Sequence, residues 1–154
     1  MEEIEHFTDD RHKARCIHCG STIIYRHTNR DHVPTKGLLK RPLPPHVPQV
    51  EVYKECNTSF SLNEEYFVTF LSCVEAGSTA PSAQRNPKIG RALTRNPSLA
   101  TRLQAAKQIT VNEYGRQLIL WLPEIERIHR VILKMPEAML STSTESQCWT
   151  IQSL

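Results

Sequence analysis

The sequence lacks any apolar run of the length that a membrane span requires. The chain has 154 residues, and none of its apolar segments approaches the roughly 18 residues that cross a bilayer as a helix. Its first ten residues, MEEIEHFTDD, carry acids where a signal peptide carries basic residues, and no apolar core follows them. We therefore expect a cytoplasmic protein in a reducing compartment, with no membrane partner.

Cysteine is scarce, and its number is odd. The chain has five cysteines, of which Cys16 and Cys19 are only three positions apart. In a reducing compartment such a set indicates metal ligands with leftover thiols, and it argues against a disulfide framework. Cys73 falls on the apolar side of a predicted helix and Cys148 lies near the end of the chain, so we expect both to be ordinary small residues.

Acidic residues are absent from one long stretch. Between Glu75 and Glu113 there is no Asp or Glu, although the net charge of the whole chain is only +3. Six basic residues lie in this stretch: Arg85, Lys88, Arg91, Arg95, Arg102 and Lys107. Lys88, Arg91 and Arg95 would share one helical face. That face would either contact a phosphate backbone or simply be solvated, and the sequence favours neither.

The first half of the chain predicts mixed α+β structure. Short runs of β-branched and aromatic residues predict strands at residues 22–25 and 30–33. Five prolines between positions 34 and 50 predict an irregular loop there, because proline cannot continue a helix or donate to a strand ladder. Ser61 and Glu64 form a capping-box pattern before apolar residues at helical spacing, which predicts a helix at residues 62–75.

The second half predicts a small α-rich extension. Small and polar residues at 77–87 indicate a linker, so the predicted domains are residues 1–79 and residues 80–154. The residue patterns predict helices at 88–95, 98–108 and 123–135, a strand at 117–122, and an irregular tail from 141 to 154.

The spacing of Cys16 and Cys19 is typical of a zinc knuckle, because two thiolates on a tight turn can both reach one tetrahedral Zn²⁺. A second pair of cysteines would complete such a site. Cys56 stands where the last member of that pair is expected, but Tyr53 occupies the position three before it. The histidines that could supply a fourth ligand are His12, His18 and His46. The alternative is that the thiols pack without a metal.

Three polar residues have the chemistry of a phosphodiesterase. Asp31 and His32 are adjacent on a predicted strand, and Asn57 precedes the predicted helix. A neutral histidine can take a proton from water, and carboxylate and amide oxygens can hold a hard cation such as Mg²⁺ that stabilises the charge on a phosphate. Each residue taken alone is more often structural, so a phosphodiesterase is indicated only because all three occur in one order.

That order resembles the HNH endonuclease family, whose fold is also called the His-Me finger. The similarity runs from Cys-x-x-Cys through Asp-His-Val-Pro to Cys-Asn-x-x-Phe-Ser-x-x-Glu-Glu-Tyr-Phe, over residues 16–67. The resemblance implies a ββα-metal module, supported by a zinc knuckle, that cuts DNA or RNA with one divalent ion. It also implies that His32 is the general base and that Asp31 and Asn57 bind the catalytic Mg²⁺ or a similar ion.

Two departures from the family pattern leave alternatives open. The middle residue of the motif, usually Asn, is replaced by Pro48 or His46, and His46 would only partly substitute for an Asn that braces the loop. Tyr53 takes the place of a cysteine. The runner-up interpretation is therefore a catalytically degenerate HNH or zinc-knuckle module that binds nucleic acid or a partner protein. A third is a purely structural, zinc-stabilised interaction protein.

Overall fold

The computed structural model of the chain describes residues 15–24 and 27–142, with side chains up to residue 134. Two compact units divide it: Met1–Ser59 with Leu133–Leu154, and Phe60–Ile132. This division differs from the boundary near residue 80 suggested by the sequence, which falls inside the second unit. Residues 141 and 142 of the predicted irregular tail are helical instead. The rest of that tail and the first 14 residues lie outside the described part.

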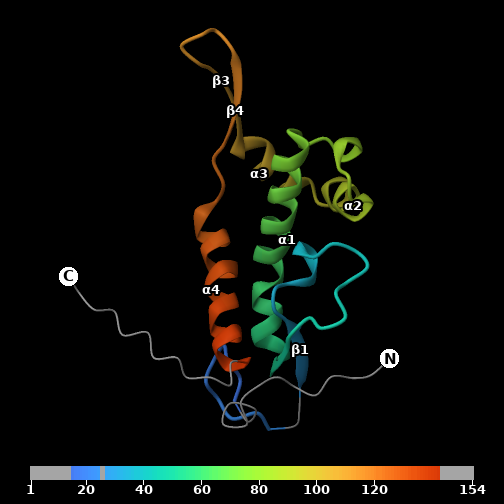
Figure 1. Cartoon of the computed structure of the whole chain (residues 1–154), viewed down its shortest axis with the longest axis vertical. Helices are drawn as coiled ribbons and strands as arrows, with labels where there is room; N and C mark the ends of the chain where they lie inside the picture. Colours follow the sequence, from blue (N-terminus) through green and yellow to red (C-terminus); the bar gives the residue numbers. More distant parts are fainter. Residues whose placement is uncertain (1–14, 25–26, 143–154) are drawn as a thin grey trace, which may run out of the picture. The chain divides into compact units, whose positions relative to one another are not determined.

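The first unit is built on a small antiparallel sheet. β1 (Thr28–His32) pairs with β2 (Gln49–Tyr53), and α1 (Lys54–Ala76) follows β2 without a loop (Figure 1). The register sets Asp31 opposite Val50 and His32 opposite Gln49. A buried cluster underlies the sheet: Cys16, Val33, Val50 and Val52, with Ile17, Ile23, Tyr53 and Cys56 packed against it.

β1 overlaps the strand predicted at residues 30–33, but the strand predicted at 22–25 is reduced to one bridge between Thr22 and Arg15. Tyr25 lies outside the described residues. β2 was not predicted, because its sequence directly follows the proline-rich loop. In that strand Val50 and Val52 are buried at alternate positions, as expected for a sheet with one covered face.

α1 begins eight residues before the predicted start at residue 62, so the capping-box prediction at Ser61 and Glu64 is wrong. The backbone N–H of Lys54 donates to the His27 carbonyl at 2.7 Å, which fixes the entry into the helix. The Thr58 hydroxyl then donates to the Lys54 carbonyl at 2.7 Å. Such backward bonds keep hydroxyl residues within the helix, although local propensity favours them at caps.

The second unit contains most of α1, α2 (Pro87–Arg95), α3 (Pro97–Ala106), β3 (Lys107–Val111), β4 (Gln117–Trp121) and the start of α4 (Ile125–Thr142). The predicted helices at 88–95 and 98–108 and the predicted strand at 117–122 are confirmed with small shifts of their ends. α3 stops before residue 108 because the chain continues directly into β3, which pairs with β4 as a hairpin (Figure 1).

Tyr66 is the centre of the second unit's packing. Its side chain is buried, and its hydroxyl accepts a hydrogen bond from the Glu124 N–H at 2.8 Å. Along α4, Ile128 and Val131 are also buried. The leucines of β4, in contrast, are not buried: Leu118 and Leu120 remain about half exposed in the chain as described. No helix in the described part of the chain is long and apolar enough to cross a membrane.

Gly90 provides a test of the packing in α2. A Cβ atom at this position would lie 2.7 Å from the backbone oxygen of Pro81. Helix propensity alone favours alanine over glycine by about 1 kcal/mol, but the clash should dominate. We expect Gly90→Ala to lower the free energy of unfolding by about 1–3 kcal/mol in urea melts. Arg91→Ala, at the neighbouring exposed position, should change it by less than about 0.5 kcal/mol. A Gly90→Ala protein as stable as the parent would contradict the close contact between α2 and the Pro81 backbone.

Candidate functional site

Three cysteines of the first unit lie close enough to hold one metal ion. The sulfur atoms of Cys16, Cys19 and Cys56 are all within 4.8 Å of one another. Cys16 and Cys19 come from a turn closed by a hydrogen bond from the Gly20 N–H to the Cys16 carbonyl at 2.8 Å, and Gly20 has the positive φ that this turn requires. Cys56 belongs to the first turn of α1. The predicted grouping of these three residues is thus confirmed.

The chemistry of this cysteine cluster fits zinc. Tetrahedral Zn²⁺ with Zn–S bonds of about 2.3 Å holds its sulfur ligands about 3.8 Å apart, so the cluster needs little adjustment. Hydrogen bonds from Ser21 lower the pKa of Cys19 to about 7, whereas burial and then the neighbouring thiols raise the pKa of Cys56 to about 12. Three neighbouring thiols cannot all lose their protons without a nearby cation, because the three negative charges would repel one another. A bound metal ion would provide the positive charge.

The fourth position of the cysteine cluster is not filled by any His, Cys, Asp or Glu among the described residues. Tyr53, which stands in place of a cysteine, instead donates its hydroxyl hydrogen to the Thr22 carbonyl at 2.6 Å and so ties the knuckle segment to β2. His18 and His46, two of the predicted fourth ligands, are not part of the cluster. His12, the third, lies outside the described residues.

His18 faces a different group. It lies within the knuckle between the two cysteines, its side chain is only 3% exposed, and its Nε2 atom is 3.4 Å from Asp31 Oδ2. An ionised carboxylate can only accept, so the Nε2–H of His18 donates to Asp31. The knuckle therefore contacts the first residue of the predicted catalytic set.

Asp31 is a buried carboxylate with two partners. Besides His18, the ammonium group of Lys134 lies 2.7 Å from its Oδ2 atom. Burial raises the pKa of Asp31, but hydrogen bonds from His18 and Lys134 and the charge of Lys134 outweigh it, so the pKa is lowered overall. Asp31 is thus a negative charge that Lys134 neutralises and to which His18 donates a hydrogen bond.

Asn57 meets the same ammonium group. Its Nδ2 donates to Asn29 Oδ1 at 3.1 Å, which fixes the orientation of the amide, and its Oδ1 accepts from Lys134 Nζ at 3.4 Å. The oxygen atoms of Asp31 and Asn57 therefore converge on one positive charge. We call these two oxygens the cation seat.

Lys134 is the residue of this site that sequence reasoning missed. It lies 77 positions from Asn57, and its side chain is only 4% exposed. One signal was present: Ile128, Val131 and Lys134 recur at a spacing of three along α4, so the lysine continues an apolar stripe. A lysine on such a stripe is buried only when a partner neutralises it.

His32 ends β1, next to Asp31. Alternation along the strand turns its side chain away from that of Asp31, and it is partly buried whereas Asp31 is buried. Burial lowers the pKa of His32, the charge of Lys36 lowers it further, and Asp31 opposes both. The imidazole is therefore neutral at pH 7, which is the form that can accept a proton.

The remaining predicted residues lie elsewhere. His46 is exposed in the proline-rich loop and makes no hydrogen bond or ion pair with any described residue, so nothing ties it to Asp31, His32 or Asn57. On α2, Lys88, Arg91 and Arg95 are exposed on one face, as the sequence predicted. Ile89, Ala92 and Leu93 are buried.

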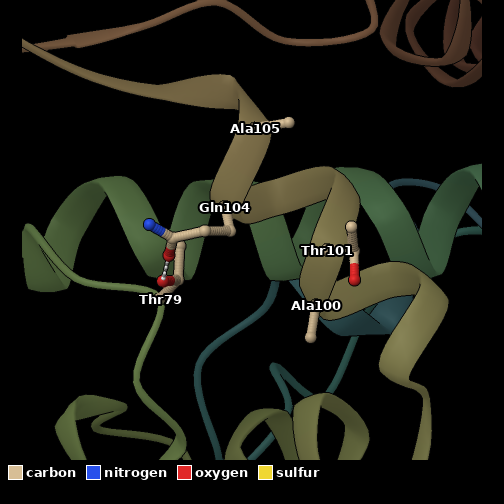
Figure 2. Close-up of a pocket in the computed structure, with 5 residues that line it drawn as sticks. All are labelled: Thr79, Ala100, Thr101, Gln104 and Ala105. Atoms are coloured by element: carbon tan, nitrogen blue, oxygen red, sulfur yellow. Dashed lines mark hydrogen bonds between the residues drawn. The ribbon is translucent and has the colours of Figure 1, made fainter.

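One open cavity of about 530 Å³ lies in the second unit, along α3. It is lined by Thr79, Ala100, Thr101, Gln104 and Ala105, and the Thr79 hydroxyl donates to the side-chain oxygen of Gln104 (Figure 2). These side chains include no acid, base or thiol, so this cavity offers no catalytic group.

Comparisons with protein-family models, with curated proteins and with solved structures found no match to this chain. The function is therefore argued from the geometry of the cysteine cluster and the cation seat.

The low pKa of Cys19 gives a direct test of the cysteine cluster. Alkylation requires a thiolate, so in chelator-treated protein at pH 7.5 we expect iodoacetamide to modify Cys19 well before Cys56 or Cys73, whose pKa values are raised to about 12 and about 11. The rate at Cys19 should rise with pH through about 7. Peptide mass spectrometry would measure it.

Zinc added back at one equivalent should protect Cys19, and Cys56→Ser should abolish that protection. Cys73→Ala is the matched control, because Cys73 lies outside the cluster. Equal labelling with and without zinc would argue against a metal at these thiols.

Proposed function

We propose that this chain is a metal-dependent HNH-type endonuclease that hydrolyses phosphodiester bonds in DNA, with RNA as the alternative substrate. The observation that carries the proposal is the cation seat, in which Asp31 Oδ2 and Asn57 Oδ1 converge on one positive charge. His32, the next residue along β1, carries a neutral imidazole on the other face of the strand, and the order β1, β2, α1 agrees with a ββα-metal module. Both agree with the resemblance noted in the sequence.

In this proposal each residue has a separate task. Asp31 and Asn57 would hold Mg²⁺ or a similar divalent ion, which supplies positive charge at the scissile phosphate. His32 accepts a proton from water through an imidazole nitrogen, and the resulting hydroxide oxygen forms a bond to phosphorus as the bond to one ester oxygen breaks. The leaving ester oxygen takes a proton from water to become a hydroxyl group, and the proton held by His32 passes to solvent.

The other predicted groups would act in support. A zinc ion at Cys16, Cys19 and Cys56 would stiffen the knuckle that carries His18, and His18 in turn orients Asp31. Lys88, Arg91 and Arg95 present three cations on one face of α2. Contacts from such a face to phosphates would add affinity that is independent of sequence and sensitive to salt.

A second candidate function is favoured by the ion pair between Lys134 and Asp31. Because a protein cation already neutralises the carboxylate, the module could have lost catalysis and kept only the binding of nucleic acid or of a partner protein. In that case binding would survive both chelation of Mg²⁺ and the substitution His32→Ala, and no cleavage would be seen.

The nuclease proposal predicts that the purified chain nicks plasmid DNA in Mn²⁺ or Mg²⁺ and stops when EDTA is added. Loss of a general base costs about 10²–10⁴-fold, so His32→Ala should cut at least about 100-fold more slowly. His129→Ala, a change at an exposed histidine on α4, should cut at the parental rate. The nuclease proposal would be refuted if the plasmid stayed uncut with both Mn²⁺ and Mg²⁺. It would also be refuted if His32→Ala were as active as the parent.

The pH profile offers an independent check on His32. Proton abstraction needs the neutral imidazole, so activity should be lost as the pH falls through the pKa of His32. Since burial and the charge of Lys36 lower that pKa by more than Asp31 raises it, the acid limb of kcat/KM should lie below the ordinary histidine value of about 6.5. An acid limb above that value would show that a different group is the base.

A further inference from the structure

The ammonium group of Lys134 occupies the cation seat, where the proposed function requires a divalent ion. Its ammonium group is 2.7 Å from Asp31 Oδ2 and 3.4 Å from Asn57 Oδ1, and its side chain is 4% exposed. These are the same two oxygens that would coordinate the metal. Both contacts lie within the first unit, which contains residue 133 onward as well as Met1–Ser59.

An ammonium group and a divalent ion cannot share this seat. Metal–oxygen bonds of about 2.1 Å would bring the ion against Lys134 Nζ, and two like charges at such a separation repel strongly when they are shielded from water. Binding of one cation therefore requires departure of the other.

The charge of the seat favours the ammonium in the absence of substrate. Among the described residues that form the seat, Asp31 carries the one formal negative charge, and His18, which also contacts Asp31, is a donor. One ammonium neutralises Asp31, whereas a divalent ion leaves an excess positive charge. A phosphodiester, with one negative charge, would remove that excess.

We infer that Lys134 is a built-in competitor for the cation seat, so that the segment of α4 carrying it must move its ammonium away before a divalent ion binds. This inference rests on the proposed function, in which Asp31 and Asn57 hold that ion. The site would then have two states. In one, the ammonium group occupies the seat and no catalytic ion is bound; in the other, the ion occupies the seat and the ammonium group is displaced. Any ligand that favours the second state, such as a phosphodiester, promotes loading.

The test is Mn²⁺ binding to the full zinc-loaded chain, measured by the loss of the free Mn²⁺ signal in electron paramagnetic resonance. Lys134→Gln removes the competing charge, and it should lower the Kd for Mn²⁺ by about tenfold or more. Lys134→Arg keeps the charge and should bind like the parent. Lys40→Gln is the matched control, because Lys40 is an exposed residue of the same unit and the change removes the same charge.

Thermal unfolding keeps the inference testable if Lys134→Gln is unstable. Without metal this variant leaves Asp31 buried with one partner fewer, so its Tm should fall. Mn²⁺ should then raise the Tm of Lys134→Gln by several degrees more than that of the parent, because the ion replaces the lost charge. A variant that stays unfolded at every Mn²⁺ concentration would overturn the inference, since Lys134 would then be a purely structural partner.

The remaining outcomes separate the inference from the proposed function. Equal Mn²⁺ affinity in the parent and in Lys134→Gln, together with Mn²⁺-dependent nicking by the parent, would overturn the competition and leave the nuclease standing. Folded parent and variant that neither bind Mn²⁺ nor nick DNA would overturn both, because the two oxygens would then form no metal seat.

Discussion

The burial of the Asp31 carboxylate is the constraint on which the candidate site depends. Removing a carboxylate from water costs several kcal/mol unless partners neutralise it, and Asp31 is 6% exposed. Its partners come from two distant parts of the sequence: His18 from the cysteine knuckle and Lys134 from α4. The charge of Asp31 therefore ties the end of β1 to the knuckle and to the second half of α4. Because Lys134 also donates to Asn57, the start of α1 joins the same network.

This network links the two metal centres that the sequence suggested. His18 lies between Cys16 and Cys19, so any ion that tightens the cysteine cluster also fixes the imidazole that contacts Asp31. Tyr53 adds a second tie between the knuckle segment and β2. The nuclease and the degenerate module share this framework. In our proposal they differ in which cation the seat holds when substrate is present, and Lys134 would decide between them.

Local patterns predicted a good part of this arrangement. Residue spacing predicted the grouping of Cys16, Cys19 and Cys56 and the basic face of α2, and the family resemblance assigned the roles of Asp31 and Asn57. β2 was missed because strand pairing is non-local and its sequence follows a run of prolines. α1 starts early because its first turn is held by the His27 carbonyl, and Lys134 was missed because its partners lie far away in sequence. The half-exposed leucines of β4 show that an apolar strand pattern does not by itself locate a core.

The central claim is that Asp31 and Asn57 form a seat for one cation, and anomalous diffraction tests it most directly. Crystals of the full Lys134→Gln chain soaked in Mn²⁺ and measured at the manganese and zinc edges should give two peaks. The account predicts a manganese peak between Asp31 Oδ2 and Asn57 Oδ1 and a zinc peak among Cys16, Cys19 and Cys56. Manganese absent from the Asp31 and Asn57 oxygens, or present there in the parent while Lys134 still contacts Asp31, would contradict it.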